Sequence, residues 1–377
     1  MWAHQFDPLA ALAQGLPRLP GKPDLVLIFG DTDRLKQSGM LGELAVRWPD
    51  AIQLACSTGS AVCGPSMADN GFSALAMGFD STRVRVEVET IRSADQSRDS
   101  GRALGARLAA PDLAGVYLMT DGLVVNGSAL VQGLQDIVGS DCEISGGMAG
   151  DGARFAETLV ALNGAVGAGT IAGIGFYGSA IRFAHGCVGG WDPFGPRRTI
   201  TASAGSVLEQ LDGRPALDLY ESYLGPEAAE LPASGLIYPL QIWDPARPDD
   251  QFVRTLLGID REAKSLLLAG DVPQGWHAQL MRGSIDRLID GAARAASDAM
   301  SAHGLAPQAC LLVSCVGRRL LMGQSTEEEI ERVHETIGPG VPMAGYFSYG
   351  EIAPRKGSLV SGLHNQTVTL TLLAEAA

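Results

Sequence analysis

Residues 25–56 of this chain read LVLIFGDTDRLKQSGMLGELAVRWPDAIQLAC, and this stretch decides the predicted fold class. Two short apolar runs, 25–29 and 52–56, lie on either side of residues 41–48, where apolar side chains recur at helical spacing. Short apolar runs are typical of buried strands, and a helix between two of them predicts an α/β unit. A second round of the same pattern follows, with strands expected at 84–88 and 116–119 and a helix expected at 101–110.

The middle of the chain predicts antiparallel strands. After a helix expected over 126–138, residues 158–181 form 24 positions without a charge, enough to cross a bilayer as one helix. Six glycines in this stretch and the turn pair Asn163-Gly164 instead predict consecutive strands inside a protein. The predicted fold class is therefore α/β (α+β), a two-domain protein with layered mixed, largely antiparallel sheets flanked by helices.

A loop rich in glycine and proline indicates the junction between the two domains. Residues 189–198, GGWDPFGPRR, hold three Gly and two Pro, a composition that breaks regular structure and suits a boundary or a binding loop. We expect an N-terminal extension over 1–23, a first domain over 24–198 and a second over 199–377. No tandem repeat of 20 to 50 residues is visible.

The second domain is expected to contain its own sheet, with strands at 311–315, 342–347 and 367–372. Two helices are expected beside it. In residues 284–303 the apolar positions fall on one helical face. Ser325 and Glu328 have the spacing of a capping box, which predicts the start of the second helix.

Charge and cysteine content exclude several classes of protein. The 377 residues include 28 Lys+Arg and 42 Asp+Glu, a net charge of −14, so we expect no nucleic acid partner and no membrane association. The six cysteines contain no C-x-x-C pair, and the N-terminus lacks the pattern of a secretory signal. These features predict a cytoplasmic protein.

His185 is the histidine that most resembles a cofactor ligand. By the period of a strand, residues 181, 183, 185 and 187 share one face, so His185 stands in an apolar row with Cys187 beside it. A neutral imidazole is the ligand that an iron porphyrin or a borderline metal requires. The alternative is a buried histidine that is hydrogen-bonded to backbone.

A second group of candidate residues lies near the end of the chain. Cys315 ends an apolar strand beside Arg318 and Arg319, whose charges would lower its thiol pKa if they pointed at it. Tyr346, Tyr349 and Glu351 lie at a strand-to-turn transition, where they could line a small-ligand pocket. Arg318 or Arg319 would hold a ligand carboxylate and Glu351 would accept from its amine. The alternatives are a buried structural cysteine and an internal Arg–Glu pair.

Motifs across the whole chain resemble the FIST sensory family, whose members join a FIST N and a FIST C domain. The motifs that carry the likeness are CSTG (56–59), GGMAGDG (146–152), GWDPFG (190–195), EQLDG (209–213), SCVGR (314–318), GYFSYGEI (345–352) and HN (364–365). The resemblance implies a non-enzymatic cytoplasmic sensor for small ligands such as amino acids. It also implies that the signal passes to a histidine kinase or a cyclic-di-GMP enzyme.

Within that family, residues 185–213 resemble the stand-alone haemoproteins that sense nitric oxide, the NosP group. This resemblance implies a b-type haem on a histidine, with His185 as the metal ligand and Cys187 and Trp191 in the cofactor site. Nitric oxide would then weaken the bond between iron and histidine. A haem-free sensor of an amino-acid-like metabolite is the first alternative, and an enzyme that uses Cys315 is the second. A homodimer is a further expectation.

Overall fold

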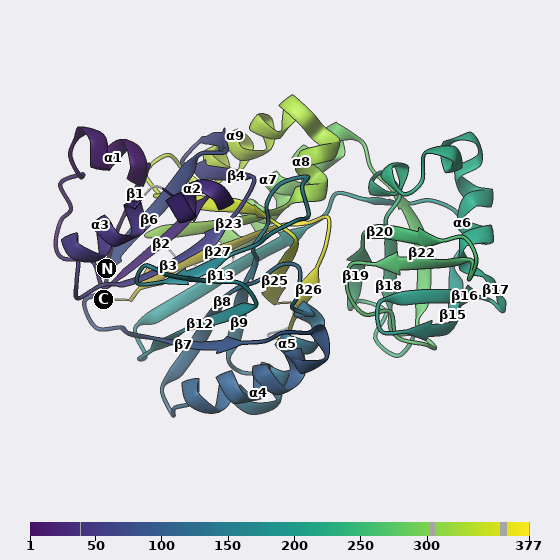
Figure 1. The fold of residues 1–377 in the computed structure, drawn as a ribbon, viewed down its shortest axis with the longest axis horizontal. Coiled ribbons are helices and arrows are strands. Elements are labelled where there is room, and N and C mark those ends of the chain that lie inside the picture. Colours follow the sequence, from purple (N-terminus) through teal and green to yellow (C-terminus); the bar gives the residue numbers. More distant parts are fainter. Residues whose placement is uncertain (38, 302–305, 355–359, 377) are drawn as a thin grey trace.

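The computed structural model describes residues 1–37, 39–301, 306–354 and 360–376, and it shows a large body and a smaller β-rich lobe. The described residues up to 189 and from 284 onward form the body, and residues 190–283 form the lobe beside it (Figure 1). In the described part of the chain, three six-stranded sheets lie in the body and a nine-stranded sheet lies in the lobe. The predicted class, mixed α/β with largely antiparallel sheets, is confirmed.

The body consists of three repeats with the same order of elements. Each repeat has an edge strand, a helix, a first inner strand, a helical segment, a second inner strand parallel to the first, a hairpin and a long return strand. Repeat one comprises β1 (Trp2–Phe6), α1 (Pro8–Gln14), β2 (Leu25–Gly30), α2 (Thr32–Gln37), α3 (Met40–Arg47), β3 (Ile52–Ser57), β4 (Ser60–Cys63), β5 (Ser66–Asp69) and β6 (Phe72–Gly78). Repeat two comprises β7 (Arg83–Thr90), α4 (Ser97–Leu108), β8 (Leu113–Thr120), α5 (Gly127–Val138), β9 (Glu143–Met148), β10 (Val160–Leu162), β11 (Ala165–Gly167) and β12 (Thr170–Tyr177). Repeat three comprises β13 (Ile181–Val188), α7 (Ile285–Ser301), β23 (Ala309–Cys315), α8 (Val316–Met322), α9 (Thr326–Ile337), β24 (Met343–Ser348), β25 (Gly350–Pro354), β26 (Ser361–His364) and β27 (Val368–Glu375).

The repeats exchange their hairpins in a cycle. The β10–β11 hairpin of repeat two pairs with β3 of repeat one, β25–β26 of repeat three pairs with β9 of repeat two, and β4–β5 of repeat one pairs with β24 of repeat three. Equivalent residues meet at each exchange, because Cys56 lies opposite Val160, Gly147 opposite Glu351, and Tyr346 opposite Ala61. The three sheets therefore form a cyclic, threefold arrangement.

The exchange corrects one prediction about the second half of the chain. The strands expected to form a separate second sheet, β23, β24 and β27, lie in one sheet with β13 and β4 from the first half. The sheets therefore cross the boundary expected between residues 198 and 199. The prediction of a separate sheet is wrong because strand pairing depends on long-range contacts that the local sequence pattern does not contain.

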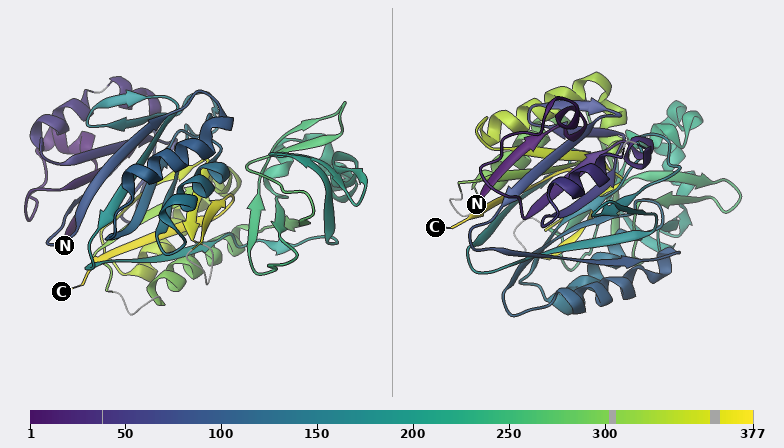
Figure 2. Two further views of the ribbon diagram at one scale, coloured as in Figure 1. Left: turned by 90° about the horizontal axis from the view of Figure 1, so that it is seen from below. Right: turned by 60° about the vertical axis from the view of Figure 1, so that its left-hand side comes forward.

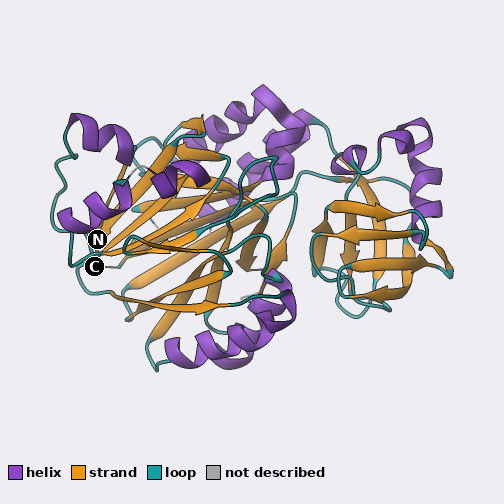
Figure 3. Ribbon diagram, in the orientation of Figure 1, coloured by secondary structure: helices purple, strands orange, loops and turns teal. Residues whose placement is uncertain are grey.

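The inner faces of the three sheets share one apolar core, and the helices cover their outer faces (Figures 2 and 3). Buried side chains of all three repeats meet in this core, including Phe29, Tyr117 and Tyr346. The helix pairs α1–α3, α4–α5 and α7–α9 each contribute to a separate outer cluster. No helix in the described ranges is long and apolar enough to cross a membrane.

The lobe is inserted into repeat three. It comprises β14 (Asp192–Pro193), β15 (Arg198–Ala204), β16 (Val207–Leu211), β17 (Arg214–Pro215), α6 (Ala216–Leu224), β18 (Leu240–Trp243), β19 (Gln251–Arg254), β20 (Leu256–Asp260), β21 (Ser265–Leu268) and β22 (His277–Arg282). It has an apolar core of its own, to which Leu208, Tyr220 and Phe252 contribute. The chain enters the lobe after β13 and returns to the body before α7.

Most local predictions are confirmed. The strands expected at 25–29, 52–56, 84–88 and 116–119, the hairpin strands after residue 158, and the helices expected at 41–48, 101–110 and 126–138 are present within a few residues. Asn126 caps α5 by accepting from the backbone N–H of Ala129. The helix expected over 284–303 is α7, and residues 302 and 303 lie outside the described ranges.

The predicted capping box at the start of α9 is wrong. Ser325 makes no side-chain bond to the helix, and its backbone is helical, with φ −67° and ψ −2°. A 3₁₀ turn over Gly323–Ser325 leads directly into α9, so Ser325 does not have the extended backbone that a capping serine needs. The helix ends at Gly338 as expected, where φ is +96°.

Candidate functional site

The two connections between body and lobe are packed against each other. Trp191 follows β13, and its indole Nε1 donates to the backbone oxygen of Gln366 at 2.8 Å. Its ring lies over Gly283, on the return connection, where an added Cβ would lie 2.7 Å from Cζ3 of the ring. The loop over 189–198 was predicted as a boundary or a binding loop, and the structure places its first residues at this junction.

Arg318 holds the same junction from inside the body. It is fully buried at the start of α8, and its Nε and Nη2 donate to Oε1 of Glu329 on α9 at 2.9 and 2.7 Å. The remaining donors reach three backbone oxygens, those of Gly189, Leu288 and Gln366. All five N–H donors of the guanidinium are thus used inside the protein. This geometry does not fit the expected carboxylate clamp, and the internal Arg–Glu pair is formed with Glu329 instead of Glu351.

Arg319, the other candidate for a ligand carboxylate, points elsewhere. Its Nη2 donates to Asp69 at 2.7 Å, and its side chain is 24% exposed. The two neighbouring arginines therefore lie in different environments.

Glu351 is a fully buried carboxyl group close to this junction. It accepts from the hydroxyl of Ser348 at 2.6 Å and from the hydroxyl and backbone N–H of Thr367 at 2.8 and 3.2 Å. Burial raises its pKa to about 8, although these hydrogen bonds and the nearby Arg318 act in the opposite direction. The carboxyl therefore keeps its proton to a higher pH than an exposed glutamate does.

Cys315 lies beside Glu351 at the N-terminal end of α8. The backbone N–H groups of Gly317 and Gln366 point at its sulfur. Burial nevertheless raises its thiol pKa, and the nearby Glu351 raises it further. The nearby Arg318 lowers the pKa, but desolvation outweighs it, so the alternative of a buried structural cysteine fits Cys315 better than a reactive thiol. Cys187 faces the same carboxyl, and burial raises its thiol pKa to about 12.

The other two repeats carry an aspartate where repeat three carries Cys315. The position is equivalent in all three repeats. Its backbone N–H donates to a backbone oxygen at the start of the return strand of the same repeat, in Asp31, Asp121 and Cys315 alike. The Asp121 carboxylate accepts from the backbone N–H groups of Leu123 and Gly169, which matches the two N–H groups that face the Cys315 sulfur. The sulfur of Cys315 thus faces backbone N–H groups that bind a carboxylate, that of Asp121, at the equivalent place in repeat two.

Gln366 and its neighbours form a site that sequence reasoning missed. Gln366 is fully buried, with a left-handed φ of +57°, and its Nε2 donates to the backbone oxygen of Leu236 in the lobe. Its Oε1 has no hydrogen-bond partner in the described part of the chain, and the same holds for Oδ1 of Asn365. A buried polar residue in this backbone region indicates a functional constraint. The only signal in the sequence was Asn365, as part of a family motif.

The lobe closes this site from the other side. Arg254 donates to the backbone oxygen of Leu363 at 3.1 Å, and Leu256 packs on Gly235 next to Leu236. Thr255 lies between these two residues, and its buried hydroxyl also lacks a partner among the described residues. Buried polar atoms without a partner among the described residues thus occur in both parts, next to residues that join the body to the lobe.

The two candidate tyrosines are separated from this junction. Tyr346 lies in the central core, stacked on Phe29 with 4.8 Å between ring centroids, and its hydroxyl faces the Cys56 thiol. Tyr349 lies on the other side of the turn, where it stacks on Phe155 at 4.6 Å and donates to Asp151. The expected ligand cluster is thus divided among three places, and only Cys315, Arg318 and Glu351 lie together.

Comparison with known proteins identifies the family. The FIST N domain model matches residues 24–214 and the FIST C domain model matches residues 216–354. The chain belongs to the FIST family. The two FIST domains meet at residue 215, which ends β17 inside the lobe. The lobe therefore contains the end of FIST N and the start of FIST C.

The relatives that match this FIST protein include proteins without an assigned function. Uncharacterised proteins of Mycobacterium tuberculosis strains CDC 1551 and H37Rv are each 28% identical over 195 residues, which is 49% of this chain and 49% of theirs. The chain thus spans about half the length of these relatives. A crystal structure of cyanuric acid hydrolase from A. caulinodans aligns with a TM-score of 0.19 and 13% identity, over 78% of this chain and all of that one. A similarity this low supports no inference about fold or activity.

His185 in this FIST protein has a protein contact at each ring nitrogen. Its Nε2 lies 2.5 Å from a carboxylate oxygen of Glu143, and its Nδ1 lies 3.4 Å from the hydroxyl of Thr371. The ring is also stacked on Phe183. An iron ligand nitrogen cannot keep a hydrogen-bond partner, so iron at His185 would displace either Glu143 or Thr371. Among the described residues, no group of three potential ligands could hold a metal ion.

Haemin titration tests the role of His185. We expect wild type and His185→Ala to give the same visible spectrum, because the imidazole is already engaged by Glu143 and Thr371. His277→Ala, in the lobe, is the control. A stoichiometric Soret band that is lost only in His185→Ala would contradict this expectation and restore His185 as the haem ligand.

Proposed function

We propose that this FIST protein is a sensor that binds a small ligand between the lobe and the body and responds by a change in the position of the lobe. FIST domains are signal-transduction sensor domains that bind small ligands. The observation that supports this site is the group of buried, unpaired polar atoms on Thr255, Asn365 and Gln366. Buried polar atoms without partners are costly, and a ligand that pairs with them would recover that cost.

The chemistry of these atoms selects the class of ligand. Two of the three are amide oxygens, which only accept hydrogen bonds, and the hydroxyl of Thr255 can do so as well. The guanidinium of Arg318 has no donor left for a ligand carboxylate. We therefore propose a ligand rich in N–H donors, such as an amine or a guanidine, with or without the carboxylate of an amino acid.

Gln366 links the proposed site to both chain segments that join the lobe to the body. The side chain of Gln366 faces the site, while its backbone oxygen accepts from Trp191 and from Arg318. Arg318 also holds the backbone oxygens of Gly189 and Leu288, which border the two connections. A ligand that favours one arrangement of Gln366 would thereby favour one position of the lobe.

The protein is proposed to act in the cytoplasm, and a histidine kinase or a cyclic-di-GMP enzyme is proposed to read the lobe. We propose no catalytic step, because Cys315 is buried, Cys187 is half-buried, and desolvation raises the pKa of both thiols. A buried thiol of raised pKa is a poor nucleophile.

Thermal unfolding in the presence of defined compounds tests this proposal. We expect agmatine, putrescine or L-arginine to stabilise the wild type, and a ligand at a hundred times its Kd adds about 2.7 kcal/mol to the free energy of unfolding. Succinate, which offers no N–H donor, should have no effect. The stabilising compound should also change the radius of gyration in X-ray scattering, because the lobe moves.

Asn365→Leu should abolish the stabilisation, since it removes one of the two amide oxygens. Gln251→Leu, on the exposed side of the lobe, should retain it. Absence of any response to the three donors, or an unchanged response in Asn365→Leu, would reject the site.

A further inference from the structure

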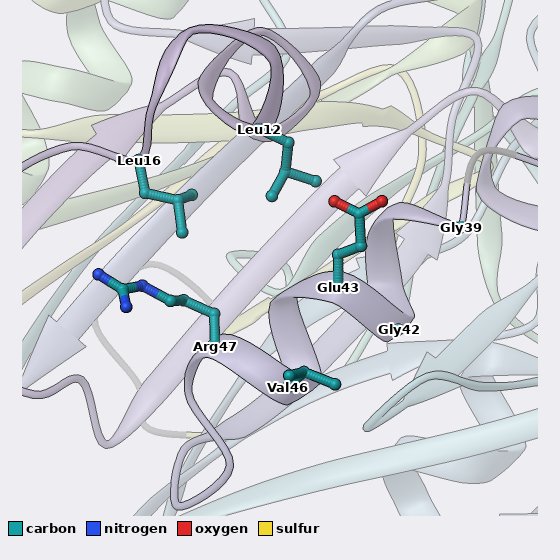
Figure 4. A pocket seen from close by; sticks show the side chains of 7 residues that line it. All are labelled: Leu12, Leu16, Gly39, Gly42, Glu43, Val46 and Arg47. Carbon is teal, nitrogen blue, oxygen red and sulfur yellow. The ribbon is translucent and has the colours of Figure 1, made fainter.

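The outer helix layer of repeat one is incomplete. In repeat two, α4 and α5 are so close that a Cβ added at Gly101 would lie 2.3 Å from the backbone oxygen of Leu130. In repeat one, α1 and α3 leave an open cavity of about 670 Å³ between them (Figure 4). It is lined by Leu12, Leu16, Gly39, Gly42, Glu43, Val46 and Arg47. The helices α4 and α5 leave no such space between them, whereas the groove between α1 and α3 is open to the outside.

The exposed face of α3 has the features of a helix-packing surface. Val46 is 83% exposed, more than any other large apolar side chain in the described ranges. A Cβ added at Gly39 or Gly42 would meet no atom within 4 Å, so nothing in the body fills the space above these glycines. Small residues beside an exposed apolar side chain allow a second helix to approach closely.

We infer that a second copy of this chain covers the groove, with the two α3 helices packed antiparallel about a twofold axis. Glu43 and Arg47 lie one turn apart at the rim of the groove, and in the described part of the chain neither forms an ion pair. A twofold axis beside Ala45 places Glu43 opposite the partner subunit's Arg47, and Arg47 opposite the partner subunit's Glu43. The surface is thus complementary in charge to itself, as a twofold interface requires.

The size of the surface predicts a weak dimer. Stable interfaces use about 20 to 30 residues on each side, whereas this groove is formed by the 8-residue α3 and the end of α1. The dimer therefore forms in a concentration-dependent manner, and the monomer dominates in dilute solution.

Charge reversal with complementation tests this inference. In sedimentation velocity over a concentration series, we expect a reversible monomer–dimer equilibrium for the wild type. Glu43→Arg and Arg47→Glu each place like charges opposite each other, so each should weaken dimerisation at least tenfold. An equimolar mixture of the two variants should form a 1:1 dimer, because two arginines then face two glutamates. Arg92→Glu, an exposed change elsewhere on the body, should behave as wild type.

Three outcomes would overturn the inference: a wild type that stays monomeric at all concentrations, single variants that dimerise as well as wild type, or a mixture that fails to dimerise. The substituted side chains are exposed, and unchanged circular dichroism would show that the variants fold. The measurement uses no ligand, so its result is independent of the proposed junction site.

Discussion

Replacing Arg318 with methionine is expected to lower the free energy of unfolding by about 3–5 kcal/mol, since it leaves a buried charge without its partner. Glu329 is fully buried, and its Oε1 accepts from two guanidinium nitrogens of Arg318. The substitution also removes the donors to the backbone oxygens of Gly189 and Leu288. Urea denaturation followed by circular dichroism measures the loss.

Arg319→Met provides a matched control at the next residue. Arg319 pairs with Asp69, whose side chain is 55% exposed, so its loss should cost less than about 1 kcal/mol. The double variant Arg318→Met with Glu329→Leu should regain part of the stability, because no unpaired carboxylate remains buried. Equal losses for Arg318→Met and Arg319→Met would show that the buried pair does not hold the junction.

Glu351→Gln is expected to remove a pH dependence of stability between about pH 4.5 and 8. The pKa of Glu351 is raised from 4.5 to about 8 in the folded protein, so the folded state binds the proton more tightly than the unfolded state. The resulting stabilisation is complete below the unfolded pKa and is lost as pH rises through the folded pKa. At about 1.4 kcal/mol per pH unit, the difference gives an upper limit of about 5 kcal/mol.

Unfolding measured at pH 5 and pH 8 tests this expectation. Glutamine cannot ionise, so at pH 8 Glu351→Gln should be more stable than wild type by a few kcal/mol, and the two proteins should be similar at pH 5. Glu375→Gln is the control, and its effect on the pH dependence of stability should have the opposite sign. Hydrogen bonds from Thr82, Asp80 and Ser81 lower the pKa of Glu375, so its contribution is lost only as the pH falls. If the difference in stability between wild type and Glu351→Gln were the same at pH 8 as at pH 5, the raised pKa of Glu351 would be contradicted.

The sequence by itself determined the local structure. Apolar runs placed β2 and β3, and Asn163-Gly164 placed the turn between β10 and β11, where Asn163 has a φ of +48°. These features are predictable because side-chain periodicity and turn preferences act over a few neighbouring residues. The family was also recognisable, because its motifs are short and keep their order along the chain.

Only the tertiary structure decided which of these elements lie together. The repeats Trp2–Gly78, Arg83–Tyr177 and Ile181–Glu375 share no visible sequence pattern, yet they exchange hairpins in a cycle. The exchange depends on pairing between segments as distant as β4 and β24, and such pairing follows from the packing of the common core.

The candidate site shows the same division. The sequence identified Cys315, Arg318 and Glu351 as residues of interest, but it showed neither that Glu329 is the acidic partner of Arg318 nor that the thiol pKa of Cys315 is raised. Both properties depend on what covers each side chain after folding, because desolvation and charge pairing act through space. The unpaired atoms of Asn365 and Gln366 were unpredictable for that reason, since their surroundings include residues as distant in sequence as Leu236.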